Sequence, residues 1–191
     1  LFPKQYHSSK RTRRIARQGR FSVTYDRAFQ QVITLCGQVP RPGQDGTWVT
    51  REMIDGYVAL HGLGYAHSVE VWEDGFLAGG LYGVSLGSLV FGESMFSRRS
   101  NASKVGFYTL MMDLVDDAFS LVDSQVHTLH MEKMGARNIP RSRYLELLNR
   151  GLEEKGRTGD WGEYFSKGQV PDDRNTGSNE RGDSSLSGGN A

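Results

Sequence analysis

The sequence predicts an α+β fold in which helices flank an antiparallel sheet. Apolar residues recur at helical spacing in four stretches, within residues 26–37, 50–62, 101–119 and 141–155. Between the second and third stretches, from residue 67 to 92, the apolar period changes to two and turn residues interrupt it. At 191 residues the chain is long enough for one substantial domain, or for a domain with a small appendage.

The first predicted element is a short basic helix over residues 8–18, with serine at its start and Gly19 at its end. The first twenty residues contain no acidic residue, although the net charge of the chain is only +1. Several of the cations recur at three- and four-residue steps along one side, which suits the successive phosphates of a folded RNA. A solvated basic helix is the alternative. The candidate RNA contacts are Arg13, Arg14, Arg17 and Arg20.

Alternating apolar residues predict a strand in Arg20–Asp26. We expect Asp26 to cap the next helix, which ends near Gly37. Cys36 is the only cysteine and lies on the apolar face of that helix, so it is expected to be a buried structural thiol. A lone cysteine excludes an internal disulfide and a cysteine-based metal cluster. Thr50 is expected to cap the helix after that.

From His67 onwards the alternation predicts an antiparallel meander. Asp74-Gly75 is a strong hairpin signal, and a glycine-rich strand, 76–84, follows it. A turn at Leu86-Gly87 then leads to a third strand over 88–92. Glycines inside the middle strand indicate a bulge, or a place where a ligand lies against the backbone.

The third strand runs into Glu93, an apolar pair and Arg98-Arg99. Ser100 or Asn101 is expected to cap the long helix that follows. Such a helix start, with cations around it and Lys104 just beyond, suits an anionic ligand such as phosphate. An ordinary strand–loop–helix junction with solvated arginines is the alternative.

A short strand over 120–124 ends in Asp123-Ser124-Gln125. Alternation places Asp123 and Gln125 on the same side of this strand, within reach of a shared ligand. The last predicted helix, 141–155, is amphipathic. Its inward residues are expected to be Tyr144, Leu147, Leu148 and Leu152.

Several kinds of chemistry lack their sequence motif. The chain has no H-E-x-x-H or Walker sequence. His127 and His130 have helical spacing, but nothing supplies a third ligand, so we expect neither a metal nor a cofactor. No stretch is long and apolar enough to span a membrane, and no signal-peptide core is present. Together with the single cysteine, this favours the cytoplasm and no membrane partner. We also expect a monomer.

A resemblance to the leucyl/phenylalanyl-tRNA–protein transferase family is carried by three blocks: WVTREMIDGYVALHGLGYAHSVEVWEDGFLAGGLYGV, GESMFSRRSNASK and LVDSQVHTLHMEKMGARNIPRSRYLELL. The blocks follow in the right order over roughly residues 2–150. The resemblance implies an acetyltransferase-like (GNAT) fold. It also implies transfer of leucine or phenylalanine from aminoacyl-tRNA to acceptor proteins with N-terminal Lys or Arg, which marks them for N-degron proteolysis.

The resemblance also assigns residues to the reaction. Asp123 and Gln125 match the Asp and Gln of the family's reaction centre, although many members have Cys where this chain has Ser124. Glu93 matches the glutamate of the GES motif, whose expected role is to hold the cationic acceptor. A surface salt bridge between Glu93 and Arg98 is the alternative.

The aminoacyl-adenosine is expected to bind at a second group of residues. Trp48 matches the family's tryptophan that contacts the terminal adenosine, and a loop-anchoring tryptophan is the alternative. Met95 has a flexible thioether that suits a pocket for both branched and aromatic side chains. Three leucines are expected to line this pocket with it, although core packing is a rival for them: Leu81, Leu110 and Leu114.

The family's usual preceding stretch, which ends in an FPWF-like motif, does not occur in this sequence. We expect residues 1–35 to be a remnant of a small N-terminal domain, 36–165 the GNAT-like catalytic domain, and 166–191 a disordered tail. Two other functions stay open. A CoA-dependent N-acetyltransferase needs a glycine-rich helix start, which Ser100–Lys104 lacks. A non-catalytic tRNA-binding module would use only the basic helix.

Overall fold

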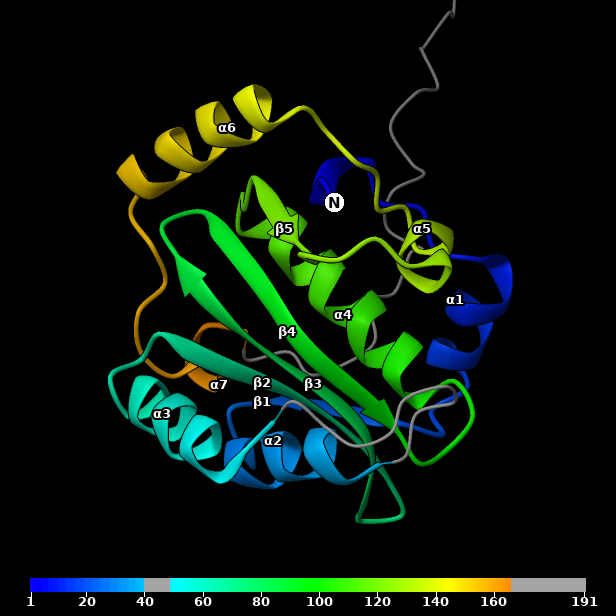
Figure 1. The fold of residues 1–191 in the computed structure, drawn as a ribbon. Coiled ribbons are helices and arrows are strands. Elements are labelled where there is room, and N and C mark those ends of the chain that lie inside the picture. The colour runs from blue at the N-terminus through cyan, green and yellow to red at the C-terminus, as the bar shows by residue number, and fades with distance from the viewer. Residues whose placement is uncertain (40–48, 166–191) are drawn as a thin grey trace, which may run out of the picture.

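A five-stranded sheet in the order β1-β2-β3-β4-β5 is the centre of the fold (Figure 1). The computed structural model describes residues 1–39 and 49–165 of the chain. The predicted tail, 166–191, and the candidate adenosine contact Trp48 lie outside the described residues. Strands β1 to β4 are antiparallel neighbours, and β5 pairs in parallel with β4. The α+β class and the meander predicted from the sequence are confirmed.

The strands are β1 (Ser22–Tyr25), β2 (Ala66–Glu73), β3 (Phe76–Leu86), β4 (Leu89–Ser97) and β5 (Leu121–Asp123). The helices are the 3-10 turn η1 (Pro3–Gln5), α1 (Lys10–Arg17), α2 (Phe29–Gln38), α3 (Arg51–Gly62), α4 (Ala102–Asp116), α5 (Leu129–Lys133), α6 (Arg141–Glu153) and α7 (Trp161–Tyr164). In the described ranges, no helix combines the length and the apolar character needed to cross a membrane.

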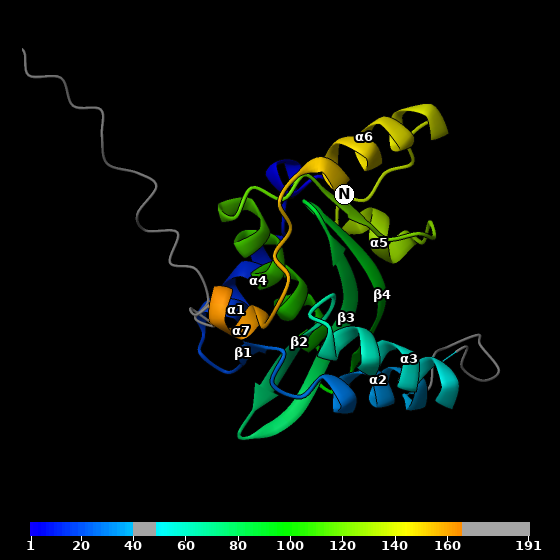
Figure 2. The same cartoon turned by 90° about the vertical axis from the view of Figure 1, so that its left-hand side faces the viewer.

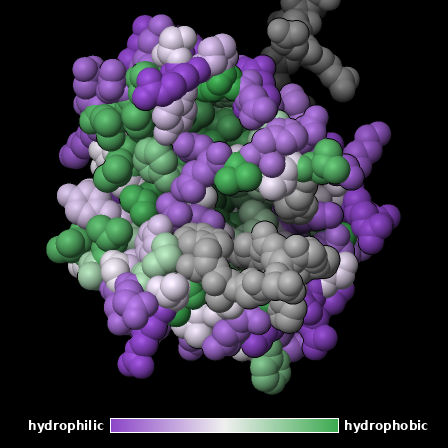
Figure 3. Space-filling view, in the orientation of Figure 1, coloured by the Kyte–Doolittle hydropathy of each residue, from purple (hydrophilic) through white to green (hydrophobic). Residues whose placement is uncertain are grey.

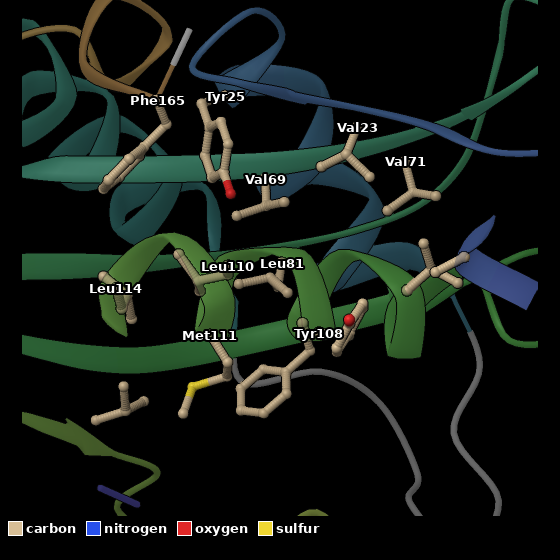
Figure 4. Packing of buried hydrophobic residues seen from close by; sticks show 14 of the residues in the cluster. Val23, Tyr25, Val69, Val71, Leu81, Tyr108, Leu110, Met111, Leu114 and Phe165 are labelled. Carbon is tan, nitrogen blue, oxygen red and sulfur yellow. The ribbon is translucent and has the colours of Figure 1, made fainter. Parts of the chain in front are cut away.

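Helices cover both faces of the sheet, and each layer has its own core (Figure 2). On one face α4 packs across β2 and β3, and the side chains of α4 meet those of the strands (Figure 4). Gly106 makes this approach possible, because a Cβ there would lie 2.6 Å from Cγ2 of Val71. On the other face α2 and α3 pack on the sheet, and Cys36 is buried there as predicted.

The hairpin between β2 and β3 is formed by Asp74 and Gly75, with φ of 51° and 78°. Two left-handed residues in a row are the geometry of a tight hairpin turn, which confirms the prediction from this dipeptide. The predicted end of the third strand at Gly92 is wrong, because β4 continues to Ser97 and pairs there with Gly79. The polar residues after Gly92 hid this continuation.

Asp26 does not cap α2, contrary to the prediction. Its φ is 56°, and its carboxylate accepts hydrogen bonds from the backbone N–H groups of Ser68 and Trp161, each at 2.8 Å. Nδ1 of His67 lies 2.8 Å from the same carboxylate. Asp26 thus ties α7 to the sheet, and the amides that precede α2 turn instead to the buried Glu70.

The predicted cap of α4 is also wrong, whereas Thr50 caps α3 as predicted, by accepting from the N–H of Met53. Asn101 has φ of 72° and makes no side-chain cap, and Ser100 makes none either. The hydroxyl of Ser97 accepts from the N–H of Ser103 at 3.4 Å instead, because the longer β4 brings it there.

The amphipathic pattern of α6 is confirmed for most of its inward positions. The exception is Leu152, which is 49% exposed, contrary to the prediction. It lies in the last turn of the helix, one residue after Gly151, which packs on Leu89 and accepts a hydrogen bond from the N–H of Ser88 at the turn between β3 and β4.

Candidate active site

Glu93 occupies a β-bulge in β4. Tyr82 pairs with Ser94 and the next residue, Gly83, pairs with Gly92, so Glu93 has no partner on β3. A bulge turns the extra residue away from the regular alternation of the strand. Gly83 permits the close approach, since a Cβ there would lie 2.3 Å from the carbonyl oxygen of Phe91. The glycines of the middle strand indicated either a bulge or a ligand against the backbone, and the structure shows a bulge in β4 opposite Tyr82 and Gly83.

The parallel pairing of β4 with β5 brings Glu93 to Gln125. Phe91 pairs with Asp123, so the residues two positions further along each chain lie beside one another. Nε2 of Gln125 donates a hydrogen bond to Oε1 of Glu93 at 3.1 Å. The salt bridge between Glu93 and Arg98, which the sequence left open as the alternative, is not among the ion pairs of the described residues.

Asp123 fixes the backbone at Gln125. Oδ1 of Asp123 accepts from the N–H of Gln125 at 2.7 Å, and Gln125 has φ of 60°. Oδ2 accepts from the hydroxyl of Tyr144 at 2.9 Å. Asp123 and Gln125 therefore meet through a turn rather than through the strand alternation that the sequence suggested, because β5 ends at Asp123.

Two tyrosines on helices complete the cluster, and neither was among the site residues predicted from the sequence. Burial raises the pKa of Tyr57, and the charge and hydrogen bond of Glu93 raise it further. Burial also raises the pKa of Tyr144, with the hydrogen bond to Asp123 as the next cause. Both phenols therefore stay protonated at neutral pH. Their inward position on a helix is the local signal in the sequence, but a tyrosine that only packs has the same pattern.

A cleft of about 240 Å³ opens beside these residues. Asp123 and Gln125 line it from β5 and the turn after it, and Tyr144 lines it from α6. Arg137, from the segment that leads into α6, and Arg141, the first residue of α6, lie on the same cleft. Among the described residues, no group of three His, Cys, Asp or Glu side chains could hold a metal ion.

The described residues expected to bind the aminoacyl group belong to the main hydrophobic core or pack against it. Met95 pairs with Leu81 across β4 and β3 and is only partly buried. Leu110 and Leu114 are 2% and 0% exposed, and Figure 4 shows Leu110 packed next to Leu81. These three leucines are part of the main hydrophobic core, so their role as the base of a pocket stays a prediction.

The candidate arginines on and just after α1 lie in two different environments. Ser9 caps α1 by accepting from the N–H of Thr12, as the sequence predicted. Arg20 is turned away and pairs with Glu73. A groove of about 480 Å³ on α1 is lined by Lys10, Arg13, Arg14, Arg17 and Gln18.

The arginines before α4 do not form a joint anion site. Arg99 pairs with Glu73 at 3.3 Å. Arg98 lines a separate cleft beside α2, together with Phe29 and His61. The alternative of an ordinary strand–loop–helix junction therefore describes this segment better.

Comparison with known proteins identifies relatives along most of the chain. The sequence model of the family described as "Leucyl/phenylalanyl-tRNA protein transferase" matches residues 1–149. A leucyl/phenylalanyl-tRNA–protein transferase of Myxococcus xanthus (strain DK1622) is 50% identical over 163 residues, which cover 85% of this chain and 70% of that protein. The enzyme of that name from Stutzerimonas stutzeri (strain A1501) is 50% identical over 161 residues, covering 84% and 70%.

Solved structures of aminoglycoside acetyltransferases are similar at much lower sequence identity. One, meta-AAC0020 from an uncultured soil metagenomic sample, has a TM-score of 0.42 at 12% identity and covers 71% of this chain and 89% of that one. The sequence matches decide the assignment: this chain belongs to the leucyl/phenylalanyl-tRNA–protein transferase family.

Proposed function

We propose that this protein transfers leucine or phenylalanine from aminoacyl-tRNA to the N-terminal Lys or Arg of acceptor proteins, in the cytoplasm, and thereby marks them for N-degron proteolysis. Membership of the family supports the reaction. The hydrogen-bonded cluster of Glu93, Gln125 and Asp123 is the single observation that carries the assignment of the reaction centre.

The reaction is the attack of an amine on an ester. The acceptor nitrogen forms a bond to the carbonyl carbon, the bond from that carbon to the ribose oxygen breaks, and the nitrogen loses a proton while the ribose oxygen gains one. The ester is already activated, so the protein needs to position the two reactants and assist the proton transfer. No covalent intermediate with the protein is required.

Gln125 is oriented for holding the attacking amine. Because its Nε2 donates to Glu93, its Oε1 is directed elsewhere and can accept a hydrogen bond from the amine. Asp123 holds the backbone of Gln125 in the left-handed region, which few non-glycine residues adopt without support. We assign Gln125 to contact with the amine. We assign Asp123 to positioning Gln125 and to accepting the proton that the amine loses.

Glu93 supplies charge for the acceptor. The bulge directs its carboxylate towards Gln125, and a carboxylate is the natural partner of a Lys or Arg side chain. We assign Met95 and the neighbouring leucines to the transferred side chain, Trp48 to the terminal adenosine, and the α1 groove to the body of the tRNA.

The test is transfer of labelled leucine from charged tRNA to two peptides that differ only in the first residue, Arg or Gly. We expect product only with the Arg peptide. Asp123→Ala should abolish this transfer while binding of the tRNA persists. Equal labelling of both peptides would contradict the role of Glu93. Acetylation of the peptide with acetyl-CoA would support the acetyltransferase instead, and tRNA binding that ignores the aminoacyl group, without transfer, would support a binding module.

A further inference from the structure

We propose that Arg137 and Arg141 form a phosphate subsite for the single-stranded 3′ end of the RNA substrate, on the cleft that holds Asp123 and Gln125. This inference rests on the proposed function and adds a second RNA contact, distinct from the α1 groove. The two arginines are exposed and line one cleft with the candidate reaction centre. Neither was named by the sequence analysis.

The first step is the state of Arg137. Its Nη2 donates to Oε1 of Gln5 at 2.9 Å, and its guanidinium lies 5.0 Å from the ring centre of Phe2. Both partners are neutral, so the side chain is held in place while its charge is not compensated. A guanidinium with remaining N–H donors in a fixed position is suited to binding phosphate oxygens.

The second step is the state of Arg141. Within residues 1–39 and 49–165, it has neither an ion-pair nor a hydrogen-bond partner. Other arginines nearby in the chain do have carboxylate partners: Arg143 pairs with Glu146 and Arg157 with Asp117. Arg141 is therefore a cation on the cleft that makes no ion pair with any described residue.

The third step is the combination of opposite charges on the cleft. Asp123 provides a carboxylate at the reaction centre, and Arg137 and Arg141 provide positive charge on the same cleft. An aminoacyl-nucleotide calls for both, because the ester that reacts is one ribose away from a phosphate. A carboxylate at the reacting amine and guanidinium groups at the phosphate fit this substrate better than they fit a neutral ligand.

Figure 3 is consistent with an exposed polar rim. The outer side of α6 is hydrophilic in this view, and hydrophobic side chains gather below the helix.

The first test measures binding alone. The probe is fluorescently labelled single-stranded ACCA RNA, titrated with the full chain at several salt concentrations. We expect Arg141→Gln to weaken binding about tenfold and to reduce the slope of log affinity against log salt by about 0.7, the loss of one phosphate contact to a single strand. Arg141→Lys should recover part of the affinity. Arg143→Gln is the matched control, because it removes the same charge from the same helix turn but does not line the cleft.

The second test isolates the phosphate. Transfer to an Arg peptide without acidic residues is compared for 3′-phenylalanyl-adenosine and for the same compound with a 5′-phosphate. We expect Arg141→Gln to lower kcat/KM about tenfold for the phosphorylated compound and to leave the other unchanged. Arg137→Lys should act in the same direction, because a lysine cannot reproduce the fixed two-pronged donor.

Three results would overturn the subsite. Equal loss with both compounds would show that Arg141 acts on the reaction or on the fold. A loss that appears only with acidic acceptor peptides would place the acceptor protein on these arginines. Equal binding of ACCA by Arg141→Gln, Arg143→Gln and the unsubstituted chain would show that Arg141 makes no contact with the RNA phosphate. If the unsubstituted chain binds ACCA in the expected way but transfers nothing from charged tRNA, the proposed function fails and the subsite stands.

Discussion

The hydroxyl of Tyr144 donates a hydrogen bond to Oδ2 of Asp123 at 2.9 Å, which joins α6 to the end of β5. The other oxygen of this carboxylate accepts from the N–H of Gln125. Both oxygens are therefore engaged, and the orientation of Asp123 depends on a helix that follows it by about twenty residues. The position of α6 thus bears on the geometry of the reaction centre.

Replacing Tyr144 with phenylalanine should lower kcat and leave KM for the acceptor peptide unchanged. The ring stays in place, but Asp123 loses one charge-assisted hydrogen bond, which corresponds to about 1.5–3 kcal/mol and hence a rate loss of roughly tenfold or more. Steady-state transfer kinetics of the variant and of the unsubstituted chain measure this. An unchanged kcat would exclude a positioning role for Tyr144.

Replacing Glu93 with glutamine should act on the acceptor and not on the tRNA. The amide keeps the size of the side chain but removes the charge that attracts an N-terminal Lys or Arg, so we expect KM for an Arg peptide to rise about tenfold. Competition between Arg and citrulline peptides is the direct measurement. The preference for arginine should disappear in the variant. A variant that still prefers arginine would separate Glu93 from acceptor recognition.

Asp113 should make the fold less stable as the pH rises. Burial raises its pKa to about 6, although the hydroxyl of Tyr25 donates to it. The unfolded chain releases this proton near pH 4, so stability is lost between about pH 4 and 6 and stays lower above that. Partial exposure screens the effect, and we expect Asp113→Asn to raise the free energy of unfolding by about 1–2 kcal/mol at pH 7.5. At pH 4 the substitution should change the free energy of unfolding little. Urea unfolding at both values measures the difference, and an equal gain at both would refute the shift.

Two glycines should respond in opposite ways to alanine. At Gly83 a Cβ would lie 2.3 Å from the carbonyl oxygen of Phe91, so the bulge must move. We expect a stability loss of about 1–3 kcal/mol together with a loss of transfer, since Glu93 moves with the bulge. Gly56 in α3 has open space around its Cβ position, so alanine there should raise the free energy of unfolding by about 0.5–1 kcal/mol. Thermal unfolding and transfer rates on the same samples compare the two, and similar effects would contradict this account of the bulge.

Local sequence patterns predicted much of the fold. The alternation after His67 and the Asp74-Gly75 turn specify the meander, because side-chain direction and turn geometry are local properties. Thr50 and Ser9 cap their helices for the same reason. The cap at Asp26 was mispredicted because its carboxylate accepts hydrogen bonds from N–H groups far away in the chain, on β2 and α7.

The candidate site could be predicted only in part. The resemblance led to Asp123, Gln125 and Glu93, but their mutual arrangement depends on a bulge and on a parallel strand pair, which no local pattern specifies. Tyr57 and Tyr144 were missed because an inward tyrosine on a helix has the same pattern whether it packs or binds a carboxylate.

The most direct test of the central claim is the single-turnover rate of transfer from leucyl-tRNA to an Arg peptide, with Asp123→Ala and Gln125→Ala measured alongside. At saturating tRNA and peptide this rate reports the chemical step. We predict a loss of roughly 10²-fold or more in each variant, and a loss in the double variant no larger than in the worse single one, because the two residues act as one unit. Near-normal rates in both single variants would contradict a reaction centre at the end of β5.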